Sequence, residues 1–296
     1  MSGGCRQGVS ALAVMPILFL SGCLFTTRKL PVPRQPAVTQ TATAEELVDQ
    51  INKRWDALQT LVVTVQIQAS VTNQKQTEVR DITSFRGHIL MAKPEKLRVL
   101  GQVPVLSTTM FNMASDGTTF TLLIPPKGIA YRGSATEPPK SSKGLESMRP
   151  KLFFDAMSVR GIGPEDHYSR TADVDTVEDP AKKHLLMIPE YMLSVMRPRP
   201  DSRELQALRV IHIHREDLLP YQQDLYDDKN NLETQVVYGR YVEYGDHLFP
   251  STITIKRPME QYQVVLTVEK VTENMPLAED TFEVKSPEGT KIESVQ

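Results

Sequence analysis

One short segment of the sequence carries residue types that could hold a metal ion. His212, His214 and Glu216 occur at alternate positions, and alternate residues of a β-strand point to the same face. Two imidazoles and a carboxylate could converge on zinc in that arrangement. The alternative is three polar side chains on the solvent-exposed face of an ordinary strand. We favour the alternative, because neither a further strong ligand nor a base for a bound water is evident, and we predict no metal site and no cofactor.

A second polar segment is acidic. Asp173, Asp175, Glu178 and Asp179 could offer carboxylates to calcium, but they lack the glycine and the spacing of a dedicated calcium loop. We therefore predict a solvated, loop-like segment over 173–179. The sequence contains no G-x-S-x-G, P-loop, H-E-x-x-H or C-x-x-C motif. We predict that the protein is not an enzyme.

The N-terminal residues combine an arginine, an apolar run and a cysteine. The run 9–20 has the length of a signal-peptide hydrophobic region and is short for a membrane span. It ends in Leu-Ser-Gly-Cys at positions 20–23, which resembles the bacterial lipobox. The resemblance implies a signal peptide over 1–22, lipidation of Cys23 and, because Leu24 rather than aspartate follows, an outer-membrane location. An ordinary secretory signal with a chance cysteine is the alternative.

Charge and cysteine content narrow the class of protein. The formal net charge of −2 over 296 residues argues against a dedicated nucleic-acid binder. The chain has two cysteines, of which Cys5 would leave with the signal peptide and Cys23 would carry lipid. The mature domain would then have no disulfide in an oxidising compartment. Its stability must come from burial of a core, which a chain of this length can supply.

The elements after the cysteine begin with a tether and a helix. Residues 23–42 are predicted as the lipidated cysteine and a proline-rich tether, and 43–296 as a single domain. Thr43 and Glu46 match a capping box at the start of a helix. Apolar residues at helical spacing then form one stripe: Leu47, Ile51, Trp55 and Leu58. We predict an amphipathic helix that packs against the rest of the domain.

Strand patterns dominate the remaining sequence. From Leu61 to Val71 apolar and polar residues alternate, which indicates a half-buried antiparallel strand. A short helix is predicted within 145–159. Further strands are predicted over 77–91, 96–100, 118–124, 129–132, 183–188, 191–196, 205–214, 221–226, 232–242, 251–257 and 262–272. Roughly ten to twelve strands with a few helices indicate an α+β fold, whose sheet either curls on itself or encloses a cavity.

Two segments carry a resemblance to a known family. In Phe85–Val99 a strand containing Gly87 runs into Pro94-Glu95-Lys96-Leu97-Arg98, and Ser115–Phe120 is followed by Ile124–Lys127. The first resembles the second and third strands of the LolA/LolB lipoprotein-carrier superfamily, and the second resembles its SDG-strand-proline-turn unit. The resemblance covers most of residues 44–285. It implies a strongly curved antiparallel sheet, an open half-barrel, with helices that cap its concave face.

The resemblance also implies a hollow that binds acyl chains. Its walls are predicted to come from the helices and the apolar strand faces: Trp55, Leu58, Val65, Ile67, Leu97, Val99, Phe120, Leu122, Leu152 and Phe153. Val105 and Leu106 correspond to a loop that contacts the membrane in LolB-like members, although Ser107 stands where glycine is usual. The alternative is that Val105 and Leu106 belong to the core of the next strand.

The sequence thus predicts a protein of the cell envelope, anchored to the outer membrane and facing the periplasm. It would bind acyl chains of lipids or lipoproteins during their trafficking or insertion, with a periplasmic carrier protein as a possible partner and no nucleic acid. The alternatives are an RseB-like sensor or scaffold and a structural lipoprotein with a filled core. An enzyme alternative would be a metal-dependent hydrolase that uses His212, His214 and Glu216.

Overall fold

The computed structural model describes the chain from residue 39 onward, with short gaps. The described residues are 39–72, 79–103, 108–135, 149–179 and 184–295. Cys23 and the predicted membrane contacts Val105 and Leu106 lie outside them.

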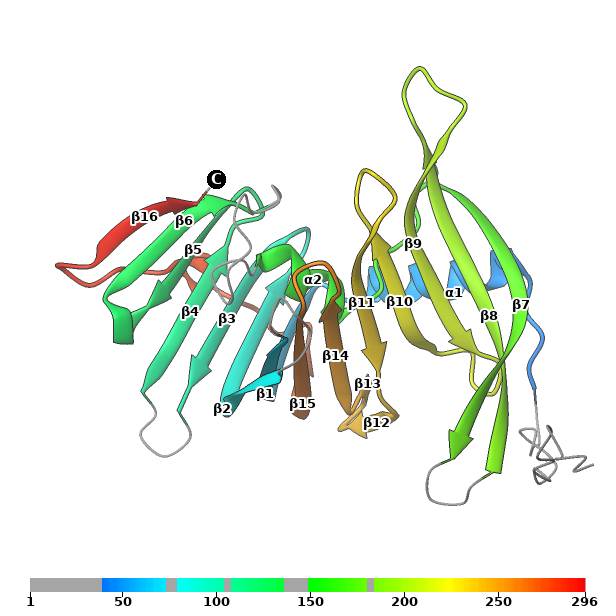
Figure 1. The fold of residues 1–296 in the computed structure, drawn as a ribbon, viewed down its shortest axis with the longest axis horizontal. Helices are drawn as coiled ribbons and strands as arrows, with labels where there is room; N and C mark the ends of the chain where they lie inside the picture. Colours follow the sequence, from blue (N-terminus) through cyan, green and yellow to red (C-terminus); the bar gives the residue numbers. More distant parts are fainter. Residues whose placement is uncertain (1–38, 73–78, 104–107, 136–148, 180–183, 296) are drawn as a thin grey trace, which may run out of the picture.

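Fourteen strands of the described chain form one sheet, and a further two form a separate hairpin (Figure 1). The order in the large sheet is β16-β6-β5-β4-β3-β2-β1-β15-β14-β11-β10-β9-β8-β7. The strands are β1 (Thr60–Thr72), β2 (Val79–Ala92), β3 (Lys96–Gln102), β4 (Thr109–Ser115), β5 (Thr119–Ile124), β6 (Ile129–Ser134), β7 (His167–Asp179), β8 (His184–Pro198), β9 (Leu205–His214), β10 (Pro220–Tyr226), β11 (Leu232–Tyr238), β12 (Tyr241–Tyr244), β13 (His247–Pro250), β14 (Thr252–Arg257), β15 (Tyr262–Glu273) and β16 (Lys291–Val295). Among the strand pairs of the described residues, only β16 and β6 run parallel. The predicted α+β class with an open, curved antiparallel sheet is confirmed.

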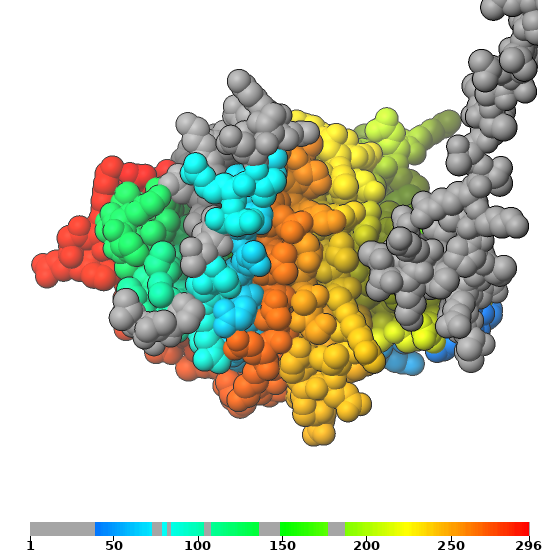
Figure 2. Space-filling view, turned by 60° about the horizontal axis from the view of Figure 1, so that its bottom comes forward, coloured from blue at the N-terminus to red at the C-terminus, as the bar shows by residue number. Residues whose placement is uncertain are grey.

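The first strand of the domain pairs with a strand from its C-terminal part in the middle of the sheet. β1 pairs with β15 through a register that includes Leu61 with Glu273 and Ile67 with Leu266. The same arrangement is visible in Figure 2, which is coloured by residue number: β1 and β2, in cyan, lie directly beside β14 and β15, in orange. Strands that are distant in the sequence therefore form the centre of the fold.

Strand register shows that one face of the sheet is mostly apolar from β1 to β6 and from β8 to β11, and we call it the inner face. Residues paired directly across neighbouring strands lie on the same face. From β1 to β6 the pairs join Val63, Ile89, Val99, Met113, Leu122 and Tyr131. From β11 to β8 they join Val236, Gln223, Ile211 and Leu193.

α1 (Ala44–Ala57) begins with the predicted capping box. The Glu46 amide donates to Thr43 Oγ1 at 3.1 Å, and the Thr43 amide donates to Glu46 Oε2 at 2.7 Å. Its buried residues Leu47, Val48 and Ile51 pack in one cluster with inner-face residues of β8 and β9. The predicted capped amphipathic helix is confirmed, and it lies on the inner face.

The residues just before α1 are bound to the sheet. The Gln40 amide donates to the Arg215 carbonyl at 2.6 Å, and the Ala42 amide donates to the Tyr191 hydroxyl at 3.4 Å. The guanidinium groups of Arg170 and Arg215 lie 4.7 and 4.9 Å from the centre of the Tyr191 ring, and they donate to the Ala42 and Gln40 carbonyls respectively. This clamp fixes the start of α1 at the β8–β10 end of the sheet.

α2 (Pro150–Met157) is the second helix of the described chain, within the predicted range 145–159. Proline is accommodated at its first turn because the amide there needs no helical acceptor. Phe153 and Phe154 are buried in the cluster formed by β1–β6 and β14–β15. Neither described α-helix is long and apolar enough to span a membrane.

The structure corrects several expected elements. The acidic segment 173–179 is part of β7 and not a loop, so that prediction was wrong. β7 is an edge strand whose described side chains from His167 to Thr176 are all exposed, so burial imposes no alternation on it. The described part of the predicted strand 183–188 and the predicted strand 191–196 belong to one strand, β8. The predicted strand 232–242 divides into β11 and β12.

Candidate functional site

The β1–β6 half of the inner face is filled by the protein's own side chains. Phe153 and Phe154 of α2 are each 1% exposed and pack against this half. A Cβ atom added at Gly87 would lie 2.4 Å from Ile67 Cδ1, so the wall beneath also has no spare room. This part of the sheet is a packed core.

The other half of the inner face holds a pocket of about 310 Å³, which we call the α1 pocket. It lies between α1, the residues that follow α2, β9–β11 and the β12–β13 hairpin. Its buried lining residues are mostly apolar: Leu47, Ile51, Leu58, Met157, Ile213, Pro220, Tyr238, Phe249 and Pro250. Pockets that bind small ligands span about 300–1,000 Å³, so this volume suits one slender apolar group.

The mouth of the α1 pocket is marked by its exposed lining residues. Arg54 and Ala57 come from the last turn of α1, and Asp246 and Leu248 come from the β12–β13 hairpin. Leu248 is 50% exposed, so an apolar side chain stands in solvent at the edge of an apolar pocket. Such an arrangement suits an apolar ligand that enters between the helix and the hairpin.

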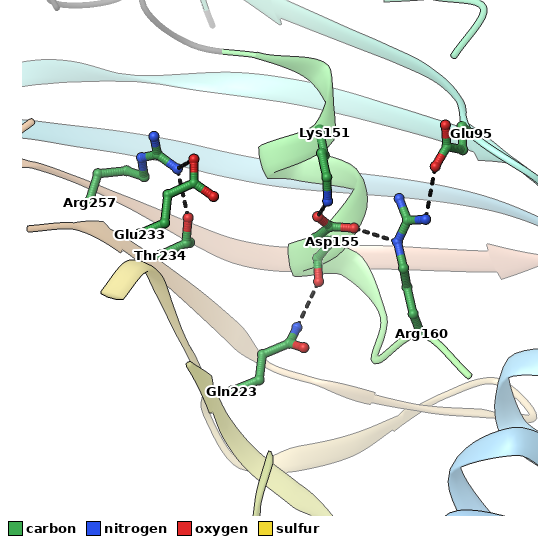
Figure 3. A network of polar contacts seen from close by, with 8 residues as sticks. All are labelled: Glu95, Lys151, Asp155, Arg160, Gln223, Glu233, Thr234 and Arg257. Atoms are coloured by element: carbon green, nitrogen blue, oxygen red, sulfur yellow. Dashed lines mark hydrogen bonds and ion pairs between the residues drawn. The ribbon is translucent and has the colours of Figure 1, made fainter. Parts of the chain in front are cut away.

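A polar network shapes the α2 side of the α1 pocket (Figure 3). Arg160 Nε donates to Asp155 Oδ1 at 2.5 Å and Arg160 Nη1 donates to Glu95 Oε1 at 2.9 Å; Lys151 is also paired with Asp155. Gln223 donates to the Asp155 backbone carbonyl at 2.7 Å. Burial opposes the charge of Arg160, but Asp155 and Glu95 outweigh it and raise the pKa of Arg160 above its ordinary value. The guanidinium therefore stays charged.

The network extends into the pocket wall itself. The Gln223 side chain also donates to the Tyr238 hydroxyl at 2.5 Å, and Tyr238 lines the pocket. Met157, Ser158 and Val159 line it as well. Ser158 Oγ is buried without a hydrogen-bond partner among the described residues. That hydroxyl is therefore a costly polar atom beside an otherwise apolar space.

Side chains of the β12–β13 hairpin bind it to β10 and β15 of the main sheet. Tyr241 donates to the Pro220 carbonyl at 2.9 Å, Tyr244 donates to the Val268 carbonyl at 3.1 Å, and His247 Nδ1 lies 3.2 Å from Glu273 Oε2. Burial raises the pKa of Tyr241, so its hydroxyl remains a neutral donor. An isolated two-stranded hairpin is only marginally stable, so these contacts control the position of this wall.

α1 is fastened to the segment after α2 by one side chain. Asn52 Nδ2 donates to the Ile162 carbonyl at 3.2 Å, and the Ile162 amide donates to Asn52 Oδ1 at 2.7 Å. Lys93 Nζ lies 4.2 Å above the Trp55 ring and donates to the Trp55 carbonyl. Because α1 forms one wall of the α1 pocket, these contacts fix the position of that wall.

The predicted cavity residues fall into two groups. Trp55 and Leu58 line the α1 pocket. The others lie in the packed core of the filled half, each at most 7% exposed: Val65, Ile67, Leu97, Val99, Phe120, Leu122, Leu152 and Phe153. Sequence reasoning did not select Ile213, Tyr238 or Phe249. The alternation with His212 and His214 marks Ile213 as a candidate for a buried face, whereas Phe249 in His-Leu-Phe-Pro carries no such signal.

The histidines considered for zinc do not converge on one point. β9 ends at His214, so the alternation does not reach Glu216. His212 lies between two carboxylates, with Nδ1 at 3.2 Å from Glu190 Oε2 and Nε2 at 3.5 Å from Asp224 Oδ2. The His214 ring instead stacks at 4.0 Å on Tyr221. Within the described ranges, no three His, Cys, Asp or Glu side chains are placed to hold a metal ion.

Comparison with known proteins gives similarity in fold but not in sequence. No protein-family model matches the chain, and no curated protein matches it. The LolA superfamily protein NE2245 from Nitrosomonas europaea is similar at a TM-score of 0.50 and 13% identity, over 82% of this chain and 99% of that one. This chain therefore has the fold of LolA-superfamily proteins.

Two further solved structures are similar at a TM-score of 0.49 and 15% identity. One is a DUF1329 family protein from Desulfovibrio piger, matched over 81% of this chain and 95% of that one. The other is a domain from Vibrio parahaemolyticus named for outer membrane lipoprotein sorting, matched over 81% of this chain and 97% of that one.

Proposed function

We propose that this chain, which has the LolA-like fold, is an envelope protein that binds an acyl chain of a lipid or lipoprotein in the α1 pocket. The observation that carries the proposal is an apolar pocket of about 310 Å³ beneath α1, beside a β1–β6 half whose described core side chains are buried. Its exposed edge between α1 and the β12–β13 hairpin gives an acyl chain a way in from solvent.

The physical basis is transfer by affinity. Each CH₂ group that leaves water for an apolar environment contributes about 0.8 kcal/mol, so a long acyl chain gains enough to bind without a covalent step. The acyl chain can pass from the pocket to a bilayer if burial in the membrane contributes a similar free energy. We propose a binding protein without catalytic activity on this basis. The pocket volume favours one acyl chain at a time over the several chains of a lipoprotein anchor.

The proposed location follows from the N-terminal sequence. Lipid on Cys23 would hold the domain at the outer membrane, facing the periplasm, and two acyl chains suffice for stable anchoring. Metabolic labelling with palmitate tests this part: we expect label on the wild-type chain in the outer-membrane fraction. Cys23→Ser should lose the label, whereas Cys5→Ser should keep it. Label retained by Cys23→Ser would contradict the anchor.

Native mass spectrometry tests the binding part. We propose to purify the chain from residue 23, with Cys23→Ser, from bacterial cells under mild conditions. The expected result is a folded protein that carries a mass excess of one acyl lipid, which solvent extraction then releases and identifies. A folded protein with no excess mass, even after incubation with lipid vesicles, would contradict the proposal.

A structural lipoprotein with a filled core is the second candidate, and it has its own support. Val65, Val99 and Leu122 of the β1–β6 half are all at most 1% exposed, so most of the inner face already buries its own side chains. That candidate predicts the negative outcome of the same experiment, so one measurement separates the two.

A further inference from the structure

We infer that the α1 pocket selects acyl ligands that bear an anionic head group, and that Arg54 contacts this group at the mouth. The inference rests on the proposed function and names the ligand class that the site accepts. Fatty acids and monoalkyl phosphates share the required chemistry, which is one apolar chain that ends in an oxyanion.

Arg54 is the cation that the helix places at the mouth. It lies in the last turn of α1, it is exposed, and it belongs to the pocket lining. The neighbouring Lys53 is also exposed but does not line the pocket. Residues four apart on a helix share a face, so Arg54 stands above Gln50, which also lines the mouth.

Arg54 forms no ion pair within the described part of the chain. Arg160 and Arg257 do, since each lies within 3.2 Å of a carboxylate. Glu273 and Asp246 are the acidic residues of the pocket lining, and His247 Nδ1 lies 3.2 Å from Glu273 Oε2. Asp217 also acts on the lining residue Tyr241. Asp246 is exposed on the hairpin turn, so it is a negative charge at the mouth that a variant can remove.

The charge of Arg54 also acts on the pocket lining. Tyr241 lines the α1 pocket, and burial raises the pKa of its hydroxyl while the charge of Arg54 acts in the opposite direction. Arg54 is thus close enough to act on a residue inside the pocket. An acyl ligand with its tail against Ile213 and Phe249 would bring its head group to the same mouth.

The chemistry of arginine fits this assignment. A guanidinium forms two parallel hydrogen bonds with a carboxylate or phosphate and keeps its charge at any physiological pH. Such charge-assisted bonds are about twice as strong as neutral ones. An ester or an alcohol of the same chain would bury the same apolar surface but could not form the bidentate pair. The ratio of the affinities for an acid and for its ester therefore measures what the pair between Arg54 and the head group contributes to binding.

The test compares a long-chain fatty acid, a monoalkyl phosphate and the methyl ester of the same acid. Their dissociation constants are measured by displacement of a fluorescent probe from the chain from residue 23 with Cys23→Ser. We expect the two anions to bind about tenfold more tightly than the ester. Inorganic phosphate alone should not displace the probe, because it lacks the chain.

Variants of single residues at or near the mouth then test whether Arg54 causes the preference for the acid over the ester. Arg54→Gln should bring the acid and the ester to equal affinity, because it weakens acid binding by about tenfold. Lys53→Gln should keep the preference, and Asp246→Asn should increase it. A preference that survives Arg54→Gln, or one that Lys53→Gln abolishes equally, would overturn the inference. If the inference about Arg54 fails in this way but the ester still binds, the proposed function stands. If the folded wild type binds none of the three ligands, the proposed function itself is contradicted.

Discussion

Asp155 and Arg160 form an ion pair with 2.5 Å between Oδ1 and Nε, and the residues between them supply one wall of the α1 pocket. Asp155 is 8% exposed and Arg160 is 26% exposed at the side chain. The pair closes the turn that follows α2 and so presents Met157 and Ser158 to the pocket. The stability of the fold and the shape of the candidate site are thereby linked.

Asp155→Asn should destabilise the protein strongly. The substitution leaves Arg160 partly buried without its main counter-charge, and loss of one partner of a buried pair costs about 3 kcal/mol. Urea unfolding measures the change. The matched control is Glu269→Gln, which breaks the exposed pair with Arg86 (3.1 Å) and should cost less than about 1 kcal/mol. Equal losses in the two variants would contradict the structural role of Asp155.

Asn52→Ala should loosen α1 and speed ligand binding. The variant removes both hydrogen bonds to Ile162, each of which contributes about 1 kcal/mol. We expect faster amide hydrogen exchange in α1 and a higher association rate for a fluorescent fatty acid in stopped-flow experiments. Asp49→Ala, on the exposed side of α1, is the control. An unchanged association rate in Asn52→Ala would mean that helix movement does not limit access.

Ser158→Ala should stabilise the protein and tighten binding. The buried Oγ has no hydrogen-bond partner among the described residues, so its removal relieves a penalty of about 1 kcal/mol. Thermal unfolding and probe titration give the two values. Ser169→Ala, on the exposed part of β7, should change neither. Destabilisation by Ser158→Ala would show that the hydroxyl has a bonding partner, such as an ordered water.

The contribution of His212 to stability should depend on pH. Burial opposes the charge of its imidazole, but Asp224 and Glu190 outweigh burial and raise the pKa of His212 above 6.5. A group whose pKa is raised by folding stabilises the folded state. This contribution is complete at a pH below the pKa of the unfolded state, and it is lost as the pH rises through the pKa of the folded state. The difference in unfolding free energy between wild type and His212→Gln should therefore shrink from about pH 6.5 upward.

Urea unfolding across that range measures the difference, with the exposed His167→Gln as the control. A difference that grows with rising pH would contradict the assignment of a charged His212 between two carboxylates.

Much of the fold could be predicted from local patterns. The alternation from Val63 to Ile67 identified β1 because one of its faces is buried and the other is not. The pair Thr43 and Glu46 identified the start of α1 because capping depends on neighbouring residues alone. β7 was missed because it is an edge strand whose side chains are exposed from 167 to 176, so the composition of its acidic part is that of a loop.

The site was harder to predict, because it depends on which distant elements meet. The helical stripe identified Trp55 and Leu58, which do line the α1 pocket. It could not reveal that α1 packs on β8 and β9, or that Phe153 of α2 fills the other half of the inner face. Nothing local in the sequence separates Val65 in the packed core from Ile213 in the pocket wall, since both alternate with polar neighbours.

Occupation of the α1 pocket by an acyl chain is tested most directly by a variant that blocks its mouth. Ala57 lines the mouth and is exposed, so Ala57→Trp adds a large side chain there without disturbing the core; Asp56, the exposed neighbour outside the lining, provides the control Asp56→Trp. The measurement is titration of the wild type and both variants with a fluorescent long-chain fatty acid. We predict saturable binding of one ligand per chain in the wild type and in Asp56→Trp, and loss of at least about tenfold in affinity in Ala57→Trp. Equal affinity in all three proteins, or no binding by the folded wild type, would contradict the account.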